Sequence, residues 1–166
     1  MMLPGRTSKI EPFAIDHATI CTGDVDGTTL SDMSVVVNER GRIETLAPSD
    51  TIGIPAHYHR IDSTGKYVAP GLINAHVHLF SDGRPLDPDR ATPQAQKRLK
   101  SLLSTPGGRI IATSKARTNL TTLLRSGVTT VRTLGDIGYE AVALRRKVES
   151  GALLGPRILA SGPMLA

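Results

Sequence analysis

The 166-residue sequence is poor in aromatic residues and has a single cysteine. Aromatic residues make up 3% of the chain and Trp is absent, so a core has to be built from Val, Ile, Leu, Ala and Met. The lone Cys21 excludes a disulfide within the chain, which fits a reducing compartment. The sequence also lacks an apolar stretch long enough for a signal peptide or a membrane span. We therefore expect a soluble, cytoplasmic protein that contacts no membrane.

What the chain does contain is typical of a folded globular protein. Hydrophobic residues account for 39% and charged residues for 21% of the sequence. The net charge of +5 could suggest a nucleic-acid partner. The Lys and Arg residues are, however, spread along the chain, and no motif that combines aromatic and basic residues for stacking on bases accompanies them. This pattern favours a solvated basic surface, and we expect no nucleic acid among the partners.

The sequence up to Lys66 is composed of short strands and turns. Asn38–Arg42 has the composition of a hairpin turn, with Gly41 where a left-handed backbone conformation is wanted. The runs that read as strands are residues 13–20, 33–37, 43–47 and 58–61. Residues 1–66 are therefore predicted to form a small sheet or part of a β-sandwich.

From Tyr67 onward, strand and helix patterns alternate. Short apolar strands are predicted at residues 72–76, 128–134 and 157–161, and helices at 89–103, 109–125 and 138–150, with a break at 105–108. Such alternation predicts a parallel sheet with crossover helices, and the strands should be buried on both faces.

Two histidines follow the first of these strands, in the motif His76-Val77-His78. Side chains alternate along a strand, so His76 and His78 point to the same face and can approach one ion, while Val77 points away. Neutral imidazole is a good ligand for zinc and related divalent metals. The same spacing recurs in His57-Tyr58-His59, which lies in the strand-and-turn region. Spacing alone therefore does not establish a metal site.

The surrounding sequence distinguishes His76-Val77-His78 from His57-Tyr58-His59. Residues 67–79, YVAPGLINAHVHL, closely resemble the signature V-x-P-G-[LF]-[IV]-[DN]-x-H-x-H of the amidohydrolase superfamily. Residues 123–132, LLRSGVTTVR, and 155–162, GPRILASG, resemble the next two strand motifs of that superfamily. The combination is most similar to the branch that holds imidazolonepropionase-like enzymes and Xaa-Pro dipeptidases. Many members of that branch have Asp where this sequence has Thr133, and we assign no role to Thr133 or Asp136.

This resemblance implies an α/β fold: part of a small β-sandwich (residues 1–66) followed by the first three strands of a TIM-type (β/α) barrel (residues 67–166). It implies a metal-dependent hydrolase that acts on a carbon–nitrogen bond of a small-molecule or dipeptide-like substrate. His76 and His78 would bind a divalent metal, which we expect to be zinc. The superfamily takes its general base and its remaining ligands from later strands, which this chain does not contain. We therefore expect no catalytic residue in this chain and no activity from the chain alone.

The ending at Ala166, directly after the third predicted strand, leaves several explanations open. The chain could be a truncated or frame-shifted product, a piece of a longer protein, or one of two polypeptides that complete the barrel together. A non-catalytic alternative is a remnant that self-associates into a homo-oligomer and so buries its open sheet edges.

Overall fold

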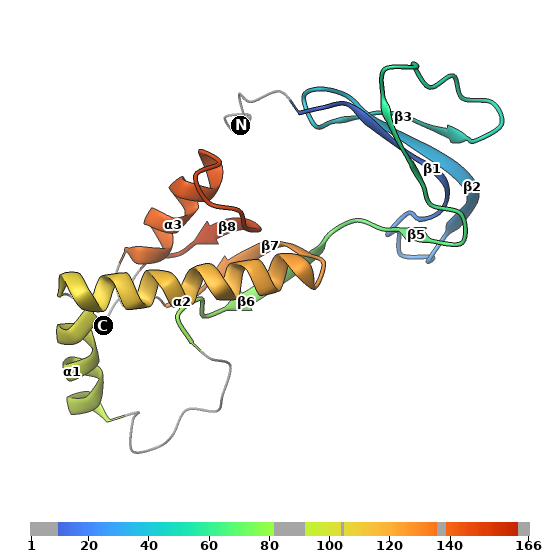
Figure 1. The fold of residues 1–166 in the computed structure, drawn as a ribbon. Helices are drawn as coiled ribbons and strands as arrows, with labels where there is room; N and C mark the ends of the chain where they lie inside the picture. Colours follow the sequence, from blue (N-terminus) through green and yellow to red (C-terminus); the bar gives the residue numbers. More distant parts are fainter. Residues whose placement is uncertain (1–9, 82–91, 104, 136–138, 163–166) are drawn as a thin grey trace. The chain divides into compact units, whose positions relative to one another are not determined.

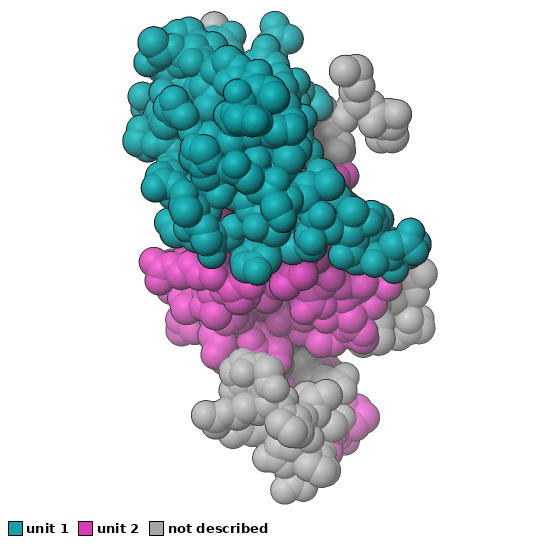
Figure 2. All heavy atoms as spheres, turned by 90° about the vertical axis from the view of Figure 1, so that its right-hand side faces the viewer, with its two compact units in different colours: residues 1–70 teal, residues 71–166 magenta. Residues whose placement is uncertain are grey.

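The computed structural model describes residues 10–81, 92–103, 105–135 and 139–162. The chain divides into two compact units, Met1–Pro70 and Gly71–Ala166, which Figure 2 shows in different colours. The sequence predicts this boundary at Lys66. It lies later because strand β5 (Tyr67–Val68) pairs with the first strand of unit 1. No helix among the described residues is long and apolar enough to cross a membrane.

Unit 1 contains one five-stranded mixed sheet (Figure 1). Its strands are β1 (Phe13–Cys21), β2 (Thr29–Val37), β3 (Ile43–Pro48), β4 (His59–Asp62) and β5, in the order β3-β2-β1-β4, with β5 also paired to β1. The predicted hairpin joins β2 to β3: Asn38 donates its backbone N–H to the Arg42 carbonyl at 3.0 Å, and Gly41 has a φ of +68°. A second sheet, which a complete sandwich requires, is not found among residues 10–70.

Unit 2 alternates strands and helices in the predicted order. It contains β6 (Leu72–Val77), α1 (Pro93–Leu103), α2 (Pro106–Arg125), β7 (Val128–Thr133), α3 (Glu140–Glu149) and β8 (Arg157–Ala160). The three strands form a parallel sheet in the order β6-β7-β8. The predicted residues 89–91 of the first helix and 138 of the last lie outside the described residues.

The start of α2 differs from the prediction. The sequence Thr105-Pro106-Gly107-Gly108 reads as a break, but only Thr105 lies outside the helix. The Thr105 hydroxyl accepts a hydrogen bond from the Gly108 N–H at 3.0 Å and so caps the helix, and Pro106 occupies the first turn. Gly108 is required there because a β-carbon would lie 2.1 Å from the Leu102 carbonyl oxygen. The segment therefore ends α1 and begins α2 directly.

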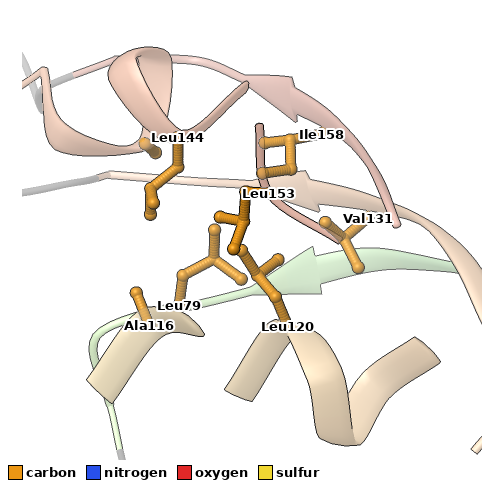
Figure 3. Close-up of a cluster of buried hydrophobic side chains, with 8 residues drawn as sticks. Leu79, Ala116, Leu120, Val131, Leu144, Leu153 and Ile158 are labelled. Atoms are coloured by element: carbon orange, nitrogen blue, oxygen red, sulfur yellow. The ribbon is translucent and has the colours of Figure 1, made fainter. Parts of the chain in front are cut away.

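The core of unit 2 lies on one face of its sheet (Figure 3). Leu120 of α2 and Leu144 of α3 pack with Val131 and Ile158 of the sheet, and with Leu79 and Leu153 from the connections. These side chains are at most 9% exposed. Removing this apolar surface from water supplies the main driving force for folding of the unit.

The opposite face of the sheet contradicts the prediction that the strands are buried on both sides. Ile73 of β6 is 72% exposed and Leu159 of β8 is 44% exposed. Both helices that pack on the sheet lie on the side of Val131, and no described element of unit 2 covers the other side. Among the described residues of unit 2, helices thus cover only one of the two apolar faces of the sheet.

Candidate metal centre

His76 and His78 are brought together at the carboxyl end of β6. His76 is the penultimate residue of the strand and His78 follows its last residue, Val77. The two Nε2 atoms lie 3.3 Å apart, and the rings meet edge to face with their centroids 5.2 Å apart. Both side chains are exposed, whereas Val77 packs against the core of unit 2. The predicted common face of the two histidines is present in the structure.

The separation of the two nitrogens fits a zinc ion. Two Zn–N bonds of about 2.0–2.1 Å that meet at the tetrahedral angle place their nitrogens about 3.3–3.4 Å apart. The measured Nε2···Nε2 separation of 3.3 Å falls within this range. At this distance the two nitrogens can also share a hydrogen bond, with the donor set by the tautomers of the two rings. The donor set and its spacing are therefore suited to a divalent metal.

The described residues supply only these two ligands. No group of three or more His, Cys, Asp or Glu side chains that could hold an ion is found within residues 10–81, 92–103, 105–135 and 139–162. Zinc sites in proteins normally have three or four protein ligands. The described residues thus bring together two candidate ligands, fewer than a zinc site normally has.

The second His-x-His motif has a different geometry. His59 begins β4 and is exposed, while His57 lies in the preceding turn and packs its ring edge to face against Tyr58, with centroids 4.9 Å apart. A turn does not keep the alternation of a strand, so equal spacing in the sequence does not produce equal placement of the rings. This pair serves as an internal control for the site at His76 and His78.

A register shift precedes His76. The pairs Asn74–Val131 and Val77–Thr133 are both in register, so β6 advances three residues where β7 advances two. The extra residue forms a bulge at Ala75 and His76, opposite Arg132. The Arg132 Nε donates a hydrogen bond of 2.9 Å to the Ala75 carbonyl oxygen. Nothing in the sequence pattern points to Arg132 as a partner of Ala75, because a bulge leaves no regular signal.

The turn after His78 is held by helix α2. The Ser81 N–H donates to the His78 carbonyl at 3.0 Å, and Leu79 is buried. Asn119 of α2 donates from Nδ2 to the carbonyl oxygens of both Leu79 and Ser81, each at 2.8 Å. These bonds connect the segment next to the histidines to the rigid part of the unit. The sequence pattern does not reveal this role of Asn119 either, since its partners are distant in the sequence.

Thr133 occupies the position at which many members of the amidohydrolase branch that this sequence resembles have Asp. It ends β7, is fully buried and faces the helix side of the sheet with Val131. It is therefore on the face opposite to the two histidines. Asp136 lies outside the described residues.

Comparison with known proteins agrees with this architecture. The model of the amidohydrolase family matches residues 67–166. The solved structure of a candidate prolidase from Bifidobacterium longum is 49% identical in sequence, with a TM-score of 0.73 over 95% of this chain and 32% of that chain. A Xaa-Pro dipeptidase structure with bound methionine in its active site is 26% identical, with a TM-score of 0.68 over 93% of this chain and 34% of that one.

A curated protein is also similar to this chain. The imidazolonepropionase of Burkholderia cenocepacia (strain HI2424) is 25% identical over 89% of this chain and 39% of its own length. The chain thus spans about two fifths of this relative and about a third of the solved structures. The family match covers more than half of the chain and agrees with the strand motifs and the α/β fold. The chain belongs to the amidohydrolase family.

Proposed function

We propose that this chain is the N-terminal part of a metal-dependent amidohydrolase that hydrolyses a carbon–nitrogen bond. Residues 71–162 would form the first three strands of its (β/α) barrel, and the sheet of unit 1 part of its β-sandwich. The observation that carries the proposal is the 3.3 Å separation of the His76 and His78 Nε2 atoms at the carboxyl end of a parallel strand. In (β/α) barrels, active sites are built at that end of the strands.

In this proposal His76 and His78 hold a divalent ion, and zinc is a metal that fits the nitrogen spacing. Such an ion, when bound, acts as a Lewis acid on the scissile carbonyl and lowers the pKa of a water molecule. Val77 between the two imidazoles packs against the core and Asn119 holds the following turn, so both neighbours of His78 are fixed to the helix side of unit 2. The general base and the remaining ligands would come from outside this chain.

The names of the relatives support a proposal for the substrate class. A candidate prolidase, a Xaa-Pro dipeptidase and an imidazolonepropionase are among the proteins that this chain resembles. We propose a dipeptide-like substrate or a small cyclic or N-acyl amide. The residues that select among these would lie outside the part of the relatives that this chain spans.

Metal titration tests the site. The purified chain is freed of metal with a chelator and titrated with Zn²⁺ or Co²⁺, monitoring heat or the visible absorption of bound cobalt. We expect weak binding, because two ligands are fewer than zinc normally has. The double substitution His76→Ala/His78→Ala should abolish this binding, and His57→Ala/His59→Ala should leave it unchanged. Equal binding by both double variants would contradict the assignment.

An activity assay tests the incompleteness of the chain. The metal-loaded chain is incubated with Xaa-Pro dipeptides, N-acyl amino acids and a cyclic amide, and release of the amine is measured. We expect no turnover above the rate with metal alone. Metal-dependent hydrolysis that is lost in His76→Ala/His78→Ala would show that the chain carries a complete site.

A non-catalytic function is the second candidate, and exposed apolar side chains favour it. Leu72 and Ile73 on the edge strand β6 are 61% and 72% exposed. Exposed apolar surface at a sheet edge promotes association. The chain would then form a homo-oligomer or complement a second chain that carries the rest of the barrel. Light scattering after size exclusion, together with metal analysis, separates the candidates: a stable metal-free oligomer supports this second function.

A further inference from the structure

The bulge in β6 decides on which face of the sheet the two histidines lie. Asn74 is in register with Val131, whose side chain is fully buried beneath the helices. In a regular strand His76 would share the face of Asn74, and both histidines would point into the core. The additional residue at the bulge reverses this order, so that Val77 packs in the core and His76 and His78 face away from it.

A bulge interrupts the regular ladder of backbone hydrogen bonds, and its polar groups need other partners. Two side chains provide them here. The Ala75 carbonyl accepts from the Arg132 Nε at 2.9 Å, and the His76 N–H donates to the Asn74 Oδ1 at 3.1 Å. Arg132 lies between Val131 and Thr133, both fully buried, so the backbone that carries its side chain is held firmly. The backbone of the bulge is therefore hydrogen-bonded by one side chain from β7 and one from β6.

The charge of Arg132 argues against a simple electrostatic role. A guanidinium beside a cation site repels the cation, so its net effect on metal affinity would be unfavourable if charge alone mattered. The hydrogen bond to the Ala75 carbonyl, by contrast, holds the peptide group that precedes His76. Partners of this kind, which orient ligands without touching the metal, typically change affinity 10- to 100-fold when removed.

We propose that Arg132 and Asn74 are positioning residues for the metal histidines: they hold the bulge at Ala75–His76 and thereby set the angle at which His76 meets His78. This inference rests on the proposed function of the histidine pair. Arg132 acts through the backbone of β6 and its positive charge is dispensable for the effect.

Two substitutions of matched size separate hydrogen bonding from charge. In Arg132→Gln the side-chain Nε2 takes the place of the arginine Nε, so an N–H donor remains while the charge is lost. Arg132→Met has the same chain length and no donor. We expect Arg132→Met to weaken binding of Zn²⁺ to the purified chain about 10-fold. Arg132→Gln should bind as tightly as the original chain or more tightly.

A readout without metal accompanies the titration. Nuclear magnetic resonance of the metal-free chain reports contacts between the His76 and His78 ring protons and their chemical shifts. We expect Arg132→Met to change these signals and Arg132→Gln to preserve them. Equal zinc affinity and equal histidine signals in Arg132→Met and the original chain would overturn the proposal. So would an equal loss in both variants, because charge would then be the cause.

A second pair of variants keeps the test decisive if Arg132→Met does not fold. Asn74→Leu removes the acceptor for the His76 N–H, and Asn74→Asp retains it. We expect weaker zinc binding and altered histidine signals only in Asn74→Leu, and unchanged values there would overturn the proposal. The proposed metal site fails separately, when His76→Ala/His78→Ala binds zinc like the original chain. The signals of the metal-free chain would then still measure the positioning effect.

Discussion

Gly71 lies so close to Thr129 that a β-carbon at position 71 would overlap the Thr129 side chain. A β-carbon on Gly71 would lie 2.1 Å from the Thr129 Oγ1, 2.3 Å from its Cγ2 and 2.7 Å from its Cβ. The contact joins the start of β6 to β7, where the Leu72 N–H also donates to the Gly127 carbonyl at 2.9 Å. The glycine of the Pro70-Gly71 sequence is therefore required by the approach of the neighbouring strand.

Gly71→Ala should destabilise unit 2 by about 1–3 kcal/mol, the usual cost of inserting an atom into a filled space. Urea denaturation followed by the circular dichroism of the helices measures this, because all described helices belong to unit 2. Gly53→Ala is the control, since nothing lies within 4 Å of its added β-carbon. In Gly71→Ala/Thr129→Gly the loss should be smaller than the sum of the single losses; strict additivity would contradict the contact.

Asn119→Asp should loosen the turn that follows His78. The aspartate has no N–H to donate, and it would face the carbonyl oxygens of Leu79 and Ser81 that Asn119 now contacts. Leaving such groups without partners costs about 1–3 kcal/mol. Hydrogen exchange of residues 78–81 should accelerate, and the urea midpoint should fall. Ser114→Asp, an exposed position on the same helix, adds the same charge and should have little effect; an equal loss there would contradict this role of Asn119.

His17 and Asp32 form an ion pair in unit 1, with the His17 Nδ1 and the Asp32 Oδ1 2.7 Å apart. The hydrogen bond to Asp32 is the main cause that raises the pKa of His17 above its ordinary value of 6.5. A raised pKa means that the pair contributes stability below pH 6.5 and that this contribution is lost as the pH rises through the pKa of the folded state.

Asp32→Asn should therefore lower the pKa of His17 toward its ordinary value, as measured by nuclear magnetic resonance titration. The protection factors of amides in β1 and β2, which are corrected for the intrinsic exchange rate at each pH, should also stop falling with pH above this value. Because both side chains are largely exposed, the effect on stability should be small and should weaken with salt. Asp50→Asn removes the same charge from an exposed turn and should leave the His17 titration unchanged. A His17 pKa that is unaffected by Asp32→Asn would refute the pairing.

Asp16 is a buried carboxylate in unit 1. The stability that it contributes should depend on pH in the direction opposite to that of the His17–Asp32 pair. Burial alone would raise its pKa, but hydrogen bonds from Ser34 and Arg60 and the charge of Arg60 outweigh this, and the pKa lies below 3.8. The Arg60 Nε lies 3.0 Å from the Asp16 Oδ2. A lowered pKa means that this stability is present above pH 3.8 and is lost as the pH falls through the pKa of the folded state.

Asp16→Asn should destabilise unit 1 by about 1–3 kcal/mol at neutral pH, because a charge-assisted hydrogen bond to Arg60 is lost. The difference from the original chain should shrink in acid. Protection factors for hydrogen exchange in β1 and β4, measured as a function of pH, report both effects. Asp26→Asn, at an exposed turn position, is the control and should change neither. A constant difference between Asp16→Asn and the original chain down to strongly acid pH would show that Asp16 does not titrate as proposed.

Much of the fold can be read from the sequence because it depends on local patterns. Alternation of strand and helix from Leu72 to Ala160 is encoded by apolar spacing and by glycines such as Gly127, which has a φ of +85°. The hairpin at Gly41 follows from turn chemistry in the same way. The predicted start of α2 is wrong because Pro106 and Gly107 break the interior of a helix but are tolerated in its first turn.

The candidate site also depends partly on local sequence patterns and partly on tertiary contacts. The sequence by itself determined that His76 and His78 share a face, because the alternation of a strand is a property of adjacent residues. Which face they share was decided only by the tertiary structure. The bulge depends on Arg132, which is 57 residues from its partner Ala75, and on the register with β7. Contacts between strands that are distant in the sequence leave no periodic signal, so only the folded chain reveals that the histidines point away from the core.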